Sequence, residues 1–190
     1  MNGLRLIQIF LSHTGEMSEY ANRVRNIVSR ENSHWEDVHK VTVRVLTFED
    51  ISSSYSVDGV QAIINQFMEG RYDIYLGIMG HKFGAPTKKN FGSGTEEEYK
   101  TAVAEFVSGR SRVARVMFGF CEVPLNPFSI DLKNLKKTKA FRKEMQSNLL
   151  YFSWESDDRF EEVIRKQLSG ALIKIINDPK NSVPGRARYI

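Results

Sequence analysis

The sequence predicts an α/β fold in which helices cover both faces of one five-stranded parallel sheet. Five apolar or alternating segments are interleaved with five segments of helical periodicity, an order typical of right-handed β-α-β units. The second strand segment alternates valine with polar residues, whereas the first, third and fourth are mostly apolar. Because a half-polar strand belongs at an edge and apolar strands belong inside a parallel sheet, we expect the strand order 2-1-3-4-5.

Each element is located from its own pattern of apolar residues, with glycine and proline marking the breaks between elements. The expected strands cover residues 4–11, 41–45, 74–79, 113–120 and 149–152. The expected helices cover residues 18–32, 57–70, 95–109, 132–145 and 157–176. We therefore expect one domain over residues 1–177, a three-layer arrangement of helix, sheet and helix. Residues 178–190 show no pattern and are expected to form a linker or a disordered tail, beyond which a sensor or effector region could follow.

Composition limits the classes of protein to which the chain can belong. With 190 residues, 41% hydrophobic and 26% charged, it suits one globular domain with a sizeable core. No apolar run approaches the roughly 20 residues that span a bilayer, so we expect a cytoplasmic protein without membrane contact. The single Cys121 excludes an internal disulfide and a multi-cysteine zinc site. The net charge is +4, but the one dense basic segment, 133–143, is typical of a solvated helix face, so nucleic-acid binding is not favoured.

The stretch from Asp73 to Ala102 organises the candidate site. It passes from an apolar strand through a glycine-rich loop to a helix start at Thr95, and ligands of open α/β sheets bind at this edge. Glu98, near the apolar face of that helix, is the candidate catalytic residue, whereas Glu96 and Glu97 are expected to face water. A structural alternative is a capping box, in which Thr95 and Glu98 satisfy the helix N-terminus.

Other polar residues meet the same edge of the predicted sheet. Ser12 and His13 follow the first strand, and His81 follows the third, where hydrogen bonding to a nucleotide is a more natural role than metal binding. The glycines from Gly77 to Gly94 match no phosphate-binding motif, so they indicate either tight turns or close approach of the backbone to a ligand. Cys121 follows the fourth strand and is expected to fill the core. No metal site is expected.

Three segments together resemble a known family. Residues 9–13 (IFLSH), 73–84 (DIYLGIMGHKFG) and 92–99 (GSGTEEEY) look like the motifs of a prokaryotic Toll/interleukin receptor-type (TIR-like) domain of the antiphage-defence type. The resemblance extends over residues 5–176, and it implies a flavodoxin-like fold. The spacing Gly94-Thr95-x-x-Glu98-x-x-x-Ala102 also resembles nucleoside deoxyribosyltransferases, in which the matching glutamate attacks the sugar.

Both resemblances imply cleavage of an N-glycosidic bond. For the TIR-like family this is the nicotinamide–ribose bond of NAD+, with NAD+ as substrate and no further cofactor, and the motif assigns the catalytic glutamate to Glu98. The expected products are nicotinamide and ADP-ribose or cyclic ADP-ribose. The residues expected to bind the substrate lie around the same edge: Ser12, His13, Phe48, Gly80, His81, Phe83 and Thr95.

The TIR-like resemblance also implies self-association, which would activate the enzyme in bacterial immune signalling. The serine-rich loop from Phe48 to Ser56 is the expected contact between copies and the expected gate of the site. Two alternatives remain open at this stage. One is a non-catalytic signalling module that recruits similar domains, and the other is an enzyme like the nucleoside deoxyribosyltransferases.

Overall fold

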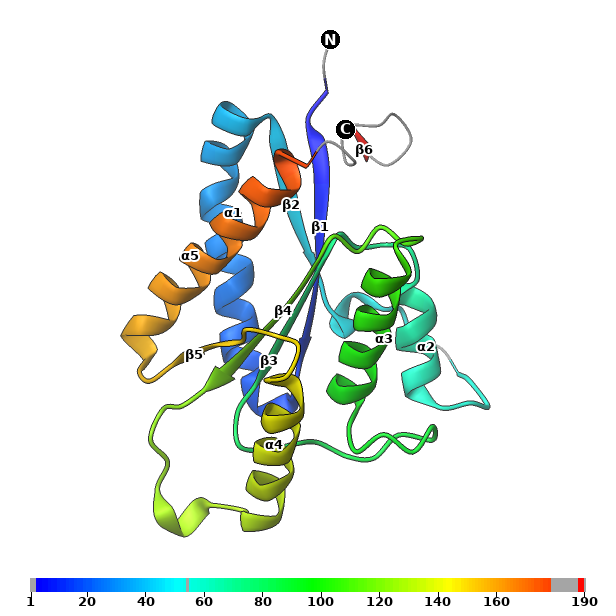
Figure 1. Ribbon diagram of the computed structural model, residues 1–190, viewed down its shortest axis with the longest axis vertical. Helices are drawn as coiled ribbons and strands as arrows, with labels where there is room; N and C mark the ends of the chain where they lie inside the picture. The colour runs from blue at the N-terminus through cyan, green and yellow to red at the C-terminus, as the bar shows by residue number, and fades with distance from the viewer. Residues whose placement is uncertain (1–2, 54, 179–187, 190) are drawn as a thin grey trace.

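The computed structural model describes residues 3–53, 55–178 and 188–189 of the chain. Five parallel strands form one sheet in the order β2-β1-β3-β4-β5, which confirms the predicted α/β fold and strand order (Figure 1). Their bounds are β1 Arg5–His13, β2 Val41–Leu46, β3 Ile74–Met79, β4 Arg115–Cys121 and β5 Phe152–Trp154. A short β6, Arg188–Tyr189, pairs antiparallel with β1, and the remainder of the expected tail from residue 179 lies outside the described residues.

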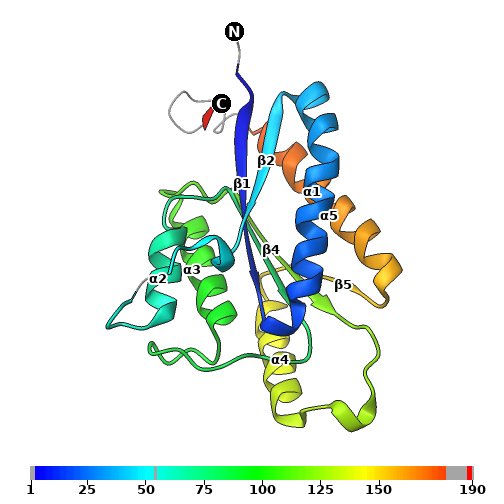
Figure 2. The same cartoon turned by 180° about the vertical axis from the view of Figure 1, so that it is seen from behind.

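Helices cover both faces of the sheet, as Figures 1 and 2 show from opposite sides. The helices are α1 Ser18–His39, α2 Val60–Met68, α3 Gly94–Ser108, α4 Leu132–Met145 and α5 Asp157–Ile176, with short 3-10 turns η1 Gly15–Met17, η2 Phe48–Asp50 and η3 Pro127–Ser129. α1 and α5 pack on one face around one hydrophobic core, and α2, α3 and α4 contribute to a second core on the other face. Among the described residues, no helix is both long and apolar enough to cross a bilayer.

Alternation along the central strands divides their side chains between the two cores. In β1, Ile9 and Leu11 belong to the core under α1 and α5, whereas Phe10 belongs to the core under α3. Consecutive residues at the end of β1 therefore face opposite sides of the sheet. Ser12 faces α3, and His13 faces the α1 side.

An ion pair fixes the beginning of β3 against its neighbours. Asp73 is buried and accepts a hydrogen bond from the backbone N–H of Gln8 at 2.8 Å. It also forms an ion pair with the guanidinium of Arg112, whose Nη2 lies 2.7 Å from Oδ1. Its backbone carbonyl also accepts from Ala114 and Arg115. Asp73 thus links the middle of β1 with the segments that lead into β3 and β4, and it sets the register that brings the carboxyl ends of these strands together.

Several boundaries differ from the prediction, among them the end of β1, which extends to His13, and the start of α2, which is Val60 and not residue 57. The first helix was expected to end near Asn32, but α1 continues to His39, because Trp35 is buried and Asn32 exchanges two hydrogen bonds with the backbone of Val43. The last strand was expected over 149–152, but β5 covers Phe152–Trp154, since pairing with β4 begins at Gly119–Phe152. Leu150 is almost fully exposed instead.

Candidate functional site

The N-terminus of α3 is capped by residues other than those the sequence suggested. Ser93 is the N-cap, and its hydroxyl accepts from the backbone N–H of Glu96 at 3.1 Å. The carboxylate of Glu96 reaches back to the N–H of Gly92 at 2.7 Å. The capping interpretation for Thr95 and Glu98 is therefore wrong, and the carboxylate of Glu98 is free for another role.

Glu98 is buried between three elements. Its side chain projects from α3, where Ser12 Oγ of β1 donates to Oε2 at 2.5 Å and Gln61 Nε2 of α2 donates to Oε1 at 2.8 Å. The residue is only 6% exposed. Burial raises the pKa of Glu98 above its ordinary value; the two hydrogen bonds oppose this effect, and the charge of Glu97 adds to it. The arrangement is a desolvated carboxylate with two fixed donors at the carboxyl edge of the sheet.

Glu97 is also buried, so the expectation that it faces water is wrong. It is 1% exposed and accepts from Asn65 Nδ2 at 2.7 Å, with Lys89 Nζ 3.5 Å away. Glu96 is largely covered as well, since it pairs with Lys100 at 2.9 Å. Gln61 and Asn65 of α2 therefore donate to Glu98 and Glu97 of α3. These hydrogen bonds help to hold α2 in place, since Met68 is the one described residue of that helix classed as buried.

A cavity of about 270 Å³ lies beside the pair formed by Gln61 and Glu98. Its lining includes Asp58, Thr87 and Lys88 together with Gln61 and Gly94. A Cβ atom at Gly94 would collide with the Gln61 side chain, so glycine at this position lets α2 approach the start of α3. Glu98 is not among the residues that line the cavity, but Gln61 both lines it and donates to Glu98, so this side chain links the cavity to the carboxylate.

The other residues expected at the site fall into separate places. Thr95 is buried, and its carbonyl accepts from the Tyr75 hydroxyl at 3.3 Å, one turn before Glu98. His13 lies on the opposite face of the sheet from Ser12 and packs against Phe48, with ring centroids 5.2 Å apart. Burial lowers the pKa of His13.

The residues after β3 have partners elsewhere. Phe83 is buried against Phe141 of α4, with ring centroids 5.6 Å apart, and has a packing role there. His81 lies beside Glu16 of η1, with Nδ1 2.9 Å from Oε2, and a Cβ atom at Gly80 would come within 2.6 Å of the same carboxylate. Of the seven residues expected to bind substrate, the structure brings Ser12 directly to Glu98 and places Thr95 nearby.

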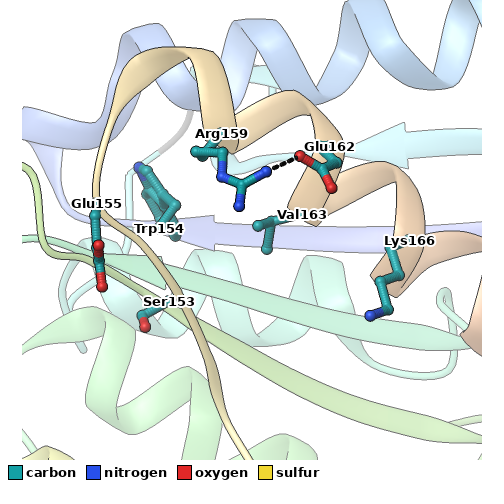
Figure 3. Close-up of a pocket in the computed structure, with 7 residues that line it drawn as sticks. All are labelled: Ser153, Trp154, Glu155, Arg159, Glu162, Val163 and Lys166. Carbon is teal, nitrogen blue, oxygen red and sulfur yellow. Dashed lines mark hydrogen bonds and ion pairs between the residues drawn. The ribbon is translucent and has the colours of Figure 1, made fainter.

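Another hollow, of about 280 Å³, lies between β5 and α5 and is shown in Figure 3. Trp154 lies along one side of it, and Arg159 and Glu162, three residues apart on α5, form an ion pair of 2.6 Å. Lys166 extends from the same helix at the far end. The paired charges of this hollow are mostly exposed, and it is separate from the carboxylate of α3. In the described ranges, no group of three His, Cys, Asp or Glu side chains could hold a metal ion.

The fold and the site define a class: an α/β domain with a doubly covered parallel sheet and a buried carboxylate at its carboxyl edge. A family model described as a domain of unknown function, DUF4062, matches residues 8–169, so the chain belongs to the DUF4062 family. A search of curated proteins finds no match. The matched family is not the TIR-like or deoxyribosyltransferase family that the motifs resemble.

Solved structures show distant likenesses. Translation elongation factor SelB from Methanococcus maripaludis, in the apo form, has a TM-score of 0.42 and 9% identity, over 93% of this chain and 36% of that chain. Homoserine dehydrogenase from S. aureus, at pH 6.5, has a TM-score of 0.33 and 13% identity, over 96% of this chain and 47% of that chain. The chain spans less than half the length of either protein, and likenesses at this level do not bear on its function.

Proposed function

We propose that the chain is an NAD+ glycohydrolase that cleaves the nicotinamide–ribose bond. The observation that carries the proposal is the state of Glu98: a buried carboxylate, held by Ser12 and Gln61, that does not cap its own helix. The motifs around it resemble those of TIR-like domains, and this resemblance supports the choice of substrate. Nicotinamide and ADP-ribose, or its cyclic form, are the proposed products.

The carboxylate would act by electrostatic stabilisation. Loss of nicotinamide leaves positive charge on the ribose C1′, and an ionised carboxylate in a desolvated site interacts with such a charge far more strongly than one in water. Ser12 and Gln61 donate to the two oxygens of Glu98, so they favour the ionised form that this role requires. They also fix its orientation, so that little reorganisation is needed as the charge develops.

Substrate would reach the carboxylate from the cavity beside α2. Gln61 lines that cavity and donates to Glu98, which does not line it, so the Gln61 side chain would turn aside for a ribose to reach the carboxylate. A ribose hydroxyl can then replace the amide as the donor to Oε1. Glu98 Oε1 therefore keeps a hydrogen-bond donor in the complex, supplied by the ribose instead of Gln61.

The experiment compares NAD+ turnover by the wild type, Glu98→Gln and Glu19→Gln, each with and without a crowding agent. Glu19 is an exposed glutamate at the start of α1 and serves as the matched control. We expect Glu98→Gln to lose at least about a hundredfold in turnover while its unfolding transition remains cooperative. Equal turnover by wild type and Glu98→Gln would refute the assignment.

A non-catalytic assembly module is the second candidate, and a specific surface favours it. Tyr55, in the loop expected to join copies of the chain, is 89% exposed, and Val57 and Val60, which follow that loop, are 74% and 73% exposed. Clustered exposed apolar side chains are typical of a protein–protein contact.

We propose that self-association through this loop activates turnover, in the cytoplasm and within a defence response. Alanine at Val57 and Val60 should then lower assembly and turnover together; assembly without turnover by the wild type would favour the signalling module.

A deoxyribosyltransferase-like activity is distinguished by its substrate. Such an enzyme would exchange the bases of deoxynucleosides and would leave NAD+ intact. Incubation of the wild type with a deoxynucleoside and a second free base tests this directly. Base exchange that Glu98→Gln abolishes would replace the NAD+ proposal but retain the role of the carboxylate.

A further inference from the structure

A second cleft opens at the same edge of the sheet but on the face covered by α1 and α5. It has a volume of about 220 Å³ and lies between η1, the start of α1 and the segments that follow β3 and β4. Met17 and Tyr20 in its wall belong to or pack against the core under α1 and α5, whereas Glu98 lies with α2 and α3 on the other face. The cleft is therefore separate from the proposed glycohydrolase site.

The polar end of this cleft is a carboxylate–imidazole pair. Glu16 Oε1 accepts from the backbone N–H of Lys82 at 2.6 Å, and Oε2 lies 2.9 Å from His81 Nδ1. The Glu16 side chain is 9% exposed and that of His81 is 19% exposed. Two acceptor atoms 2.9 Å apart would repel each other, so in the tautomer with a single N–H the proton lies on Nδ1 and Nε2 is the acceptor. Within the described part of the chain, Nε2 has no hydrogen-bond partner.

The rest of the cleft is largely apolar. Met17, Leu125 and the ring of Tyr20 form its walls, and the thiol of Cys121 lies 3.9 Å from the Tyr20 hydroxyl. Among the described residues that line it, none is a lysine or an arginine, and Glu16 contributes a negative charge. A phosphate or a carboxylate would find no cation here to compensate its loss of water. A flat neutral ring with a polar N–H suits the cleft, because its faces pack on the walls and its N–H meets the imidazole acceptor.

We propose that this cleft is a second ligand site, which binds a neutral heteroaromatic ring carrying an N–H donor, such as a free nucleobase or a pyridine carboxamide. His81 accepts the hydrogen bond, and Glu16 is the positioning residue that fixes the tautomer of the ring. The inference does not rest on the proposed glycohydrolase activity, since it uses a different face of the sheet and different residues.

Glu16 also has a structural part, since it holds the turn after β3, so the test must separate binding from folding. In Glu16→Gln the amide oxygen can still accept from Lys82, but the amide N–H₂ faces His81 Nδ1, and the ring proton moves to Nε2. The ligand N–H then meets another N–H. Leu125→Trp fills the cleft from a residue that is 38% exposed, and Leu150→Trp, at a residue 99% exposed outside the cleft, is its matched control.

Adenine and nicotinamide are the two probes, each titrated into the full chain by calorimetry up to millimolar concentration. We expect at least one probe to bind, with affinity about ten- to a hundredfold weaker in Glu16→Gln, lost in Leu125→Trp, and unchanged in Leu150→Trp. The bound probe should also slow alkylation of Cys121, the single cysteine of the chain. Binding of adenine assigns the site to purines, and binding of nicotinamide assigns it to pyridine amides. The proposal is overturned if neither probe binds, or if Leu125→Trp binds as tightly as the wild type.

Discussion

Replacing Glu98 with glutamine tests the electrostatics of the site without requiring any activity. The two side chains have the same shape. In the variant, the amide oxygen can accept from Gln61 Nε2, and the amide nitrogen can donate to Ser12 Oγ, so both hydrogen bonds of the wild type have a counterpart. The variant removes the desolvated charge that burial places on Glu98 in the folded protein.

The sign of the effect follows from the raised pKa. Burial raises the pKa of Glu98 in the folded protein above its ordinary value, which applies in the unfolded chain. Between these two pKa values the folded protein binds a proton that the unfolded chain has lost. The free energy of unfolding of the wild type therefore falls as pH rises through this window, and is level above it. Each unit by which the pKa is raised corresponds to about 1.4 kcal/mol. Glutamine has no such proton to lose, so the free energy of unfolding of the variant, relative to that of the wild type, increases by this amount as pH rises through the window.

The assay is urea unfolding followed by tryptophan fluorescence, at a series of values from about pH 4.5 to about pH 8.5. Trp35 and Trp154 are both buried, so unfolding changes the environment of each. Glu19→Gln, at an exposed position, should keep a constant difference from the wild type across the series. The reasoning is refuted if Glu98→Gln is less stable than the wild type above neutral pH, with a difference that does not change with pH.

Three further substitutions test the fold and the site. Asp73→Ala leaves the guanidinium of Arg112 partly buried without its carboxylate, and we expect it to lower the free energy of unfolding by about 3–5 kcal/mol, measured by urea unfolding. Gly77→Ala drives a Cβ atom into the ring of Phe118, so thermal unfolding should show a loss of about 1–3 kcal/mol. Gln61→Ala removes a hydrogen bond that lowers the pKa of the buried carboxylate of α3, so the pH window of falling stability should extend to higher pH.

Each of these expectations has a contradicting outcome. An Asp73→Ala protein within 0.5 kcal/mol of the wild type, about the usual range for a surface substitution, would mean that the ion pair does not organise the strands. Unchanged stability in Gly77→Ala would mean that the Phe118 ring can move away from the added Cβ atom at no cost. If the pH window is unchanged in Gln61→Ala, the Gln61 amide does not contribute to the pKa of Glu98.

The strand order could be predicted because burial is recorded in the residue pattern of each strand. Val41 to Val45 alternate in polarity and lie in the edge strand β2, whereas the apolar run of β1 lies between β2 and β3. Helix ends were harder to predict. The extension of α1 past Asn32 depends on two hydrogen bonds with Val43 of β2, which no local sequence pattern reports.

Part of the site could also be predicted. Glu98 and Ser12 were expected at one edge and are in contact there. Gln61 was missed, although Gln61 and Asn65 stand one turn apart on a helix whose other residues except Gln66 are apolar, a spacing that places both amides on one face. His81 was expected to line the same pocket, but the turn after β3 directs it to Glu16 on the other face of the sheet.

The sequence by itself determined the strands, their order and the edge at which chemistry could occur, because alternation and apolar runs are local consequences of which faces are buried. Tertiary structure alone decided which carboxylate caps α3, which ones are desolvated, and which of the polar residues share a cleft. Those outcomes depend on contacts between residues far apart in the sequence: Gln61 and Glu98 are 37 positions apart, and Ser12 and Glu98 are 86 positions apart. The pKa of a carboxyl group is set by the atoms packed around it, and its neighbours in the chain do not specify them.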